Sequence, residues 1–80
     1  MTAIIELDAT GLRCPLPVLK ARKALRSVPP GGVLELLADD PAATKDVPAF
    51  CQEIGYALIA VEADGERVRY RIAKPDEPAG

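Results

Sequence analysis

Residues 29–41 read PPGGVLELLADDP, a short apolar run between two segments that end regular structure. The paired prolines and glycines stop any helix before residue 33, and the Asp-Asp-Pro sequence ends the apolar run after residue 38. A nearly continuous apolar run of this length is typical of a strand inside a sheet. We therefore expect residues 33–38 to form a central strand, with the rest of the chain arranged around it.

The residues before this strand predict another strand and a helix. Residues 3–7 are short and rich in β-branched side chains, which favours a strand, and residues 8–11 end it. Two prolines follow, and a helix tolerates them only in its first turn. The apolar residues that then recur at helical spacing are Val18, Ala21, Ala24, Leu25 and Val28. Because a helix separates the two strands, they should be parallel, with a right-handed crossover.

The residues after the central strand predict a second helix. Its apolar stripe consists of Val47, Phe50, Cys51 and Ile54. Thr44 or Asp46 is the candidate N-cap, Pro48 would then lie in the first turn, and Gly55 is the candidate C-cap.

A hairpin completes the predicted fold. Residues 56–62 and 67–73 indicate two strands joined through Asp64-Gly65, a strong hairpin signal. In the last strand apolar residues alternate with Arg67, Arg69 and Arg71, which we expect to face solvent. The order predicts an α/β two-layer sandwich, βαβαββ, with two helices on one face of a mixed four-stranded sheet. We expect a single domain over residues 1–74 and a flexible C-terminal tail over residues 75–80.

Composition indicates a soluble globular protein. The 80 residues are 49% hydrophobic and 28% charged, with a mean hydropathy of +0.08. The longest apolar run, residues 57–61, is far shorter than the roughly 20 residues of a membrane span. Residues 1–6 lack the features of a signal peptide, so we expect a cytoplasmic protein. A net charge of −2 and a pI near 5.0 argue against a nucleic-acid binder.

Two shortages of residue types limit the chemistry. The sequence has no histidine, which removes Ser-His-Asp and Cys-His nucleophiles and histidine metal sites. Cys14 and Cys51 are too few for a cysteine-only zinc or iron–sulfur centre, so no metal is expected. A disulfide between them is not expected in a reducing cytoplasm. Any reaction must therefore use a thiol, a carboxylate or an amine.

Cys14 falls where the first helix is expected to begin. A helix N-terminus favours an anion, and cysteines there have a pKa below the usual ~8.5. The adjacent prolines lack an N–H, which leaves Leu16 and Val18 as the main donors and predicts a moderate lowering. Arg13 would add a positive charge if its side chain turned toward the sulfur. A thiolate without a base attacks sulfur rather than amides. The alternative is a small buried residue that caps the helix.

Two segments carry a family resemblance. Residues 7–18, LDATGLRCPLPV, resemble the signature of the TusA/SirA/YedF sulfur-carrier family, a Cys-Pro-x-Pro motif led by Asp-x-x-Gly-x-x-Cys. Residues 38–51, ADDPAATKDVPAFC, resemble the TusA branch in particular. The similarity spans roughly residues 6–74.

The resemblance implies a small sulfurtransferase with a βαβαββ fold and no cofactor. Its persulfide-carrying cysteine, here Cys14, accepts sulfur from a cysteine desulfurase or a rhodanese-type donor and relays it to an acceptor protein. In the TusA branch this relay can lead to 2-thiouridine in tRNA. Other members are tied to molybdenum-cofactor assembly, sulfur oxidation or selenium metabolism. We expect a monomer with no direct nucleic-acid or membrane partner.

Further residues are expected to support this site. Asp8 and Gly11 form the turn before the helix, with a direct role of Asp8 as the alternative. Pro15 and Pro17 shape the loop and the first helical turn. Cys51 also matches a cysteine of the TusA branch, but its place on the apolar stripe favours burial and packing over a resolving role.

The first helix also carries a basic strip, for which two interpretations are open. The basic side chains between residues 13 and 26 are Arg13, Lys20, Arg22, Lys23 and Arg26. Such a strip is commonly a solvated helix face, but it can also steer acidic partners. Leu16 and Leu19 fall beside Lys20 and Lys23 on this polar side, which predicts a docking spot near Cys14.

Two other functions remain as alternatives. The first is a regulatory or adaptor protein without sulfur chemistry, whose function would survive Cys14→Ser. The second is an RNA-binding module, because this fold is similar to the C-terminal domain of a bacterial translation initiation factor. The acidic pI and the 4% aromatic content count against RNA binding.

Overall fold

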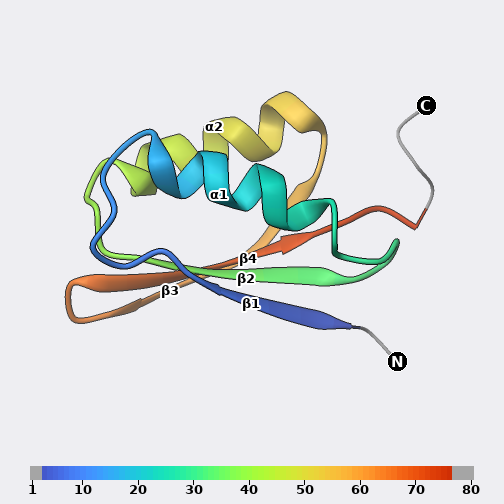
Figure 1. Ribbon diagram of the computed structural model, residues 1–80, viewed down its shortest axis with the longest axis horizontal. Coiled ribbons are helices and arrows are strands. Elements are labelled where there is room, and N and C mark those ends of the chain that lie inside the picture. Colours follow the sequence, from blue (N-terminus) through green and yellow to red (C-terminus); the bar gives the residue numbers. More distant parts are fainter. Residues whose placement is uncertain (1–2, 77–80) are drawn as a thin grey trace.

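The computed structural model describes residues 3–76 and has the predicted βαβαββ order (Figure 1). Its elements are β1 (Ile4–Asp8), α1 (Leu16–Leu25), β2 (Val33–Ala38), α2 (Ala43–Ile54), β3 (Ala57–Asp64) and β4 (Arg67–Ala73). Both helices cover one face of the sheet, and the opposite face is open (Figure 1). The predicted two-layer sandwich is confirmed.

The sheet has the strand order β1-β2-β4-β3. β1 runs parallel to β2, as the crossover through α1 predicts, while β4 is antiparallel to both β2 and β3. The strand that the sequence places inside the sheet, β2, is therefore flanked on both sides. Parallel pairing of β1 with β2 also brings the ends of these two strands to the same edge.

The core lies between the sheet and the two helices. Leu34 and Leu36 of β2 are completely buried, and Tyr70 and Ile72 alternate inward from β4. The helices meet them with Ala21, Leu25, Val47 and Phe50, which are also buried. Burying a side chain of the size of leucine stabilises the fold by about 1.5–3 kcal/mol relative to exposure.

The start of α2 corrects the sequence prediction. The helix begins at Ala43, so Thr44 and Asp46 lie inside it and neither is its N-cap. Asp40 organises this end instead. Its Oδ1 accepts a hydrogen bond from the Ala42 N–H (3.2 Å), and its backbone carbonyl accepts one from the Ala43 N–H (2.9 Å). An Asp side chain before a helix can accept backbone hydrogen bonds in this way. By residue type alone, Asp40 and Asp46 both fit this role.

The rest of α2 and the hairpin turn agree with the prediction in part. Pro48 lies inside α2 rather than in its first turn, because the helix begins earlier than predicted. Gly55 is the C-cap, as predicted, and its φ of 77° lies in the left-handed region that favours glycine. Asp64 is the last residue of β3, so the two residues of the hairpin turn are Gly65 and Glu66.

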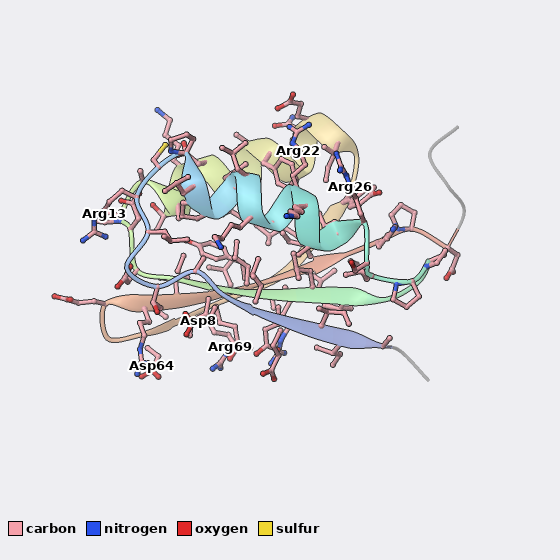
Figure 2. The ribbon with its side chains drawn as sticks, in the orientation of Figure 1. Asp8, Arg13, Arg22, Arg26, Asp64 and Arg69 are labelled. Atoms are coloured by element: carbon pink, nitrogen blue, oxygen red, sulfur yellow. The ribbon has the colours of Figure 1, made fainter. Side chains whose placement is uncertain are left out.

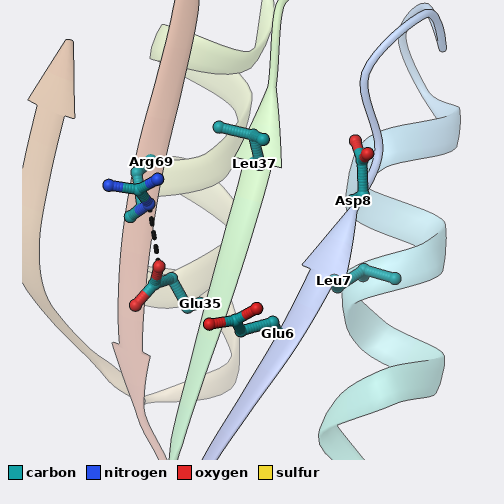
Figure 3. A pocket seen from close by; sticks show the side chains of 6 residues that line it. All are labelled: Glu6, Leu7, Asp8, Glu35, Leu37 and Arg69. Atoms are coloured by element: carbon teal, nitrogen blue, oxygen red, sulfur yellow. Dashed lines mark ion pairs between the residues drawn. The ribbon is translucent and has the colours of Figure 1, made fainter. Parts of the chain in front are cut away.

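Charged side chains form a network of ion pairs on the open face of the sheet. Glu35 pairs with Arg69 (2.8 Å) and with Arg71 (3.3 Å), and Arg71 also pairs with Glu62 (3.4 Å). Figure 3 shows Glu35 and Glu6 side by side in a hollow of this face, with Arg69 above them. The arginines of β4 thus lie on the face predicted for them, but carboxylates neutralise part of their charge.

The predicted C-terminal tail is only partly described. Residues 77–80 lie outside the described residues. The Gly31 N–H lies within hydrogen-bonding distance of the backbone carbonyls of Lys74 (3.1 Å) and Pro75 (3.3 Å). Neither α1 nor α2 has the length and the hydropathy that a helix needs to cross a membrane.

Tyr70→Phe tests how the core is packed. Tyr70 is 1% exposed, and its hydroxyl has no hydrogen-bond partner within residues 3–76. Because an unsatisfied buried hydroxyl costs about 1–3 kcal/mol, we expect removal of this oxygen to leave the free energy of unfolding unchanged or to raise it slightly. Urea unfolding followed by circular dichroism measures the difference.

Leu34→Ala is the comparison for that experiment. It leaves a cavity in the same layer and should lower the free energy of unfolding by about 2–5 kcal/mol. A loss above about 1 kcal/mol in Tyr70→Phe would contradict the prediction, because it would mean that the hydroxyl is hydrogen-bonded in solution.

Candidate functional site

Cys14 lies in the loop between β1 and α1, with its side chain exposed at one end of the helical layer. Pro15 is the N-cap of α1, Pro17 is buried in the first turn, and the Cys14–Pro15 peptide bond is cis. The Leu16 N–H, which was expected to face the sulfur, donates instead to the Arg13 carbonyl (2.8 Å). The prolines therefore shape the first turn of α1 next to the cysteine.

Asp8 shapes the turn that leads to Cys14. Its Oδ1 accepts hydrogen bonds from the backbone N–H (2.9 Å) and the hydroxyl (2.6 Å) of Thr10. These bonds favour the charged form and lower the pKa of the Asp8 carboxyl. Gly11 follows with a φ of 82°, and its N–H donates to Asp39 Oδ1 (2.9 Å). The turn is thus tied to the end of β2.

Two carboxylates contact Cys14 directly. The backbone N–H of Cys14 donates to Asp40 Oδ2 (2.6 Å), and its thiol donates to Asp46 Oδ2 (2.7 Å). Asp40 follows β2 and Asp46 lies in the first half of α2, so three separate segments meet at Cys14. Sequence reasoning assigned these two residues to a strand end and a helix cap and did not include them in the site.

The predicted electrostatics of Cys14 are wrong in sign. The hydrogen bond to Asp46 is the main cause that raises the pKa of the Cys14 thiol, followed by desolvation and by the charges of Asp46 and Asp40. These effects act in the opposite direction to a helix N-terminus, which would favour the thiolate. A thiol that donates to a carboxylate is stabilised in its protonated form.

Arg13 does not bring its positive charge to the sulfur. Its guanidinium lies 3.6 Å from Asp39 Oδ1, and its side chain is 68% exposed. Figure 2 shows Arg13 projecting from the end of the molecule where the loop between β1 and α1 turns. Arg13 therefore offsets the charge of Asp39 rather than stabilising a thiolate.

A shallow groove of about 290 Å³ runs from Cys14 between the two helices. Its lining consists of Cys14, Pro15, Val18, Asp46, Ala49, Phe50 and Glu53. Beside it, Leu16 and Leu19 are about half exposed, at 46% and 51%, as their position on the polar side of α1 predicts. Lys20 and Lys23 are also exposed.

Farther along the two helices, one basic side chain of α1 contacts an aromatic ring of α2. Arg22 lies over the Phe50 ring, with 5.3 Å between the guanidinium carbon and the ring centre. Figure 2 shows Arg22 and Arg26 projecting from the helical layer on the side away from the sheet. The basic strip therefore continues the surface that begins at Cys14.

Cys51 has a different environment. It is 2% exposed within α2, and burial raises the pKa of its thiol. The predicted burial of Cys51 is therefore confirmed. Both cysteines are free thiols. Within residues 3–76, no three side chains of cysteine, histidine, aspartate or glutamate are grouped so as to hold a metal ion.

This difference predicts selective labelling of the two thiols. In the folded protein, iodoacetamide at alkaline pH should add one carbamidomethyl group, on Cys14, because Cys51 is shielded from the reagent. Addition of denaturant should allow a second modification. Peptide mass spectrometry locates both groups, and Cys14→Ser should take up none while folded. Rapid native labelling of Cys51 would contradict the structure.

Comparisons with known proteins agree with this geometry. The family model described as sulfurtransferase TusA matches residues 5–74. A solved structure, the SirA-like protein from Desulfitobacterium hafniense, is similar with a TM-score of 0.77 and 29% sequence identity, and the match covers 89% of this chain and 97% of that one. The family match includes both helices and all but the first residue of β1. The chain belongs to the TusA sulfurtransferase family.

Proposed function

We propose that this sulfurtransferase carries sulfur as a persulfide on Cys14. A cysteine desulfurase or a rhodanese-type protein supplies the sulfur, and a downstream relay protein accepts it. The observation that carries the proposal is the contrast between the two thiols. Cys14 is exposed at the end of the helical layer, whereas Cys51 is buried in the core. Only Cys14 can meet the sulfur of another protein without unfolding.

The proposed transfer is an exchange between a thiol and a persulfide. The Cys14 sulfur attacks the terminal sulfur of the donor persulfide, and a new S–S bond forms as the donor S–S bond breaks. The electron pair of the broken bond goes to the donor cysteine, which takes up the proton that Cys14 gives up. The sum of thiols and persulfides is unchanged, so no oxidant, metal or organic cofactor is needed. The same exchange in the next step loads the acceptor.

Partner docking is proposed along the groove and the exposed side of α1. Leu16 and Leu19 offer apolar surface close to Cys14, and Lys20 and Lys23 border it with positive charge. An apolar spot with a charged border is suited to a transient complex with an acidic protein surface. In this proposal the adjacent segments have separate roles. Pro15 and Pro17 position the cysteine, Asp8 and Gly11 form the turn, and Arg13 with Asp39 ties the loop to the end of β2.

The process that we propose for the relay is 2-thiouridine formation in tRNA. The support is the match of residues 5–74 to the TusA model, together with residues 38–51, which resemble the TusA branch. Complementation tests this extension. The protein should restore thiolated uridine in the tRNA of a bacterium that lacks its own TusA, and Cys14→Ser should not.

Intact mass spectrometry tests the carrier role itself. After incubation with a cysteine desulfurase and cysteine, the protein should gain one sulfur atom that a reductant removes. Cys14→Ser should gain none, and Cys51→Ser should gain as much as the unmodified protein. If neither a desulfurase nor a rhodanese loads the folded protein while its thiol is free, the carrier role fails. Function that survives Cys14→Ser would support an adaptor instead.

Leu19→Glu tests the docking surface. It places a negative charge where we expect an acidic partner, so the rate of sulfur uptake from the donor should fall about 5- to 50-fold through like-charge repulsion and lost apolar contact. Ile59→Glu is the matched control, because Ile59 of β3 is 56% exposed and lies in another part of the surface. Equal rates for the two variants would contradict docking at Leu19. Circular dichroism checks that both fold.

A further inference from the structure

We propose that Asp46 keeps the Cys14 thiol protonated in the free carrier and that a partner protein must displace its carboxylate before sulfur moves. This inference rests on the proposed function, because it assigns a control on the cysteine that carries the sulfur. Such a control would make Cys14 react more readily with sulfur donors that dock on the protein than with small reactive molecules that do not.

The hydrogen bond between Cys14 and Asp46 fixes the position of a proton. An ionised carboxylate can only accept hydrogen bonds, so the 2.7 Å contact between Cys14 Sγ and Asp46 Oδ2 exists only while one of the two groups holds a proton. A carboxyl group is a far stronger acid than a thiol, so the proton of this hydrogen bond lies on the sulfur. Asp46 therefore acts as a hydrogen-bond acceptor that stabilises the protonated thiol, and not as a base that removes the proton.

Of the other charged groups around the sulfur, Asp40 reinforces this effect. Asp40, from the loop between β2 and α2, accepts the Cys14 backbone N–H and adds a second negative charge. Glu53 of α2 lines the same groove, but the thiol donates its hydrogen bond to Asp46. Arg13, on the same loop as Cys14, is engaged with Asp39. On the side of α1, the groove is lined by Val18 and by the N-cap residue Pro15, which carry no charge.

A docked partner can reverse this balance. A cationic or hydrogen-bond-donating side chain of the partner that binds Asp46 would remove the acceptor of the thiol and bring a positive charge close to the sulfur. The Cys14 proton can then leave to the partner, and the sulfur can attack the donor persulfide. Once loaded, a persulfide anion would again face Asp46 and Asp40, and their repulsion would favour transfer to the acceptor.

Asp46→Asn tests the inference on the free protein. We expect the pH midpoint of Cys14 alkylation by iodoacetamide to fall, because the substitution removes a carboxylate that favours the neutral thiol. At pH 7.5 the alkylation rate should rise about 3- to 10-fold, in proportion to the thiolate fraction. Peptide mass spectrometry reports modification of Cys14 alone. Asp46→Ala removes the same charge and serves as a second variant if Asp46→Asn does not fold.

Glu53→Gln is the matched control. It removes one negative charge from the same helix and the same groove, but the thiol hydrogen bond goes to Asp46. Its alkylation rate should stay within about twofold of the unmodified protein, because an exposed charge without direct contact is screened by solvent. A midpoint for Asp46→Asn that equals the control or lies above it would overturn the inference.

Sulfur uptake separates failure of this inference from failure of the proposed function. Alkylation needs no sulfur donor, so its result stands even if Cys14 proves not to carry sulfur. With inorganic polysulfide as a donor that cannot dock, Asp46→Asn should load faster than the unmodified protein by about the same factor as in alkylation. Loading by a cysteine desulfurase should gain less. An equal gain with both donors would overturn the role of docking.

Discussion

The site depends on the parallel pairing of β1 with β2. This pairing places Asp8 opposite Leu37, and the Ala9 N–H continues the ladder to the Leu37 carbonyl (2.8 Å). The loops that leave the two strands therefore start from the same edge of the sheet. One loop carries Cys14 and the other carries Asp40. A hydrogen bond of 2.6 Å from the Cys14 backbone N–H to Asp40 Oδ2 joins the two loops.

The electrostatics of the cysteine follow from this arrangement and suit a relay protein better than an enzyme with its own substrate pocket. The thiol lies in the open and the sulfur atom is small, so no deep cavity is needed for it. Carboxylates rather than cations surround it, and this lowers the reactivity of the thiol while it has no partner. In the relay that we propose, recognition of a partner falls to the surface around the groove, where the half-exposed Leu16 and Leu19 lie.

The two faces of the sheet serve different purposes. The covered face supplies the core that holds α1 and α2 in place, and with them both sides of the groove. The open face is a network in which Glu35 pairs with Arg69 and Arg71. Because these ion pairs join β2 to β4, the Glu35 carboxylate offsets part of the positive charge on β4. On the helical layer, Lys20 and Lys23 of α1 are exposed basic side chains.

The sequence by itself determined the order of the elements, because periodicity, prolines and glycines act over a few residues and do not depend on distant contacts. It also singled out Cys14 through its flanking prolines, and it placed Cys51 in the core through the apolar stripe of α2. Only the tertiary structure decided the chemistry at the sulfur. Asp46 lies 32 residues after Cys14 and reaches it through the packing of α2 beside α1. No local pattern encodes that contact, and it reversed the expected direction of the Cys14 pKa.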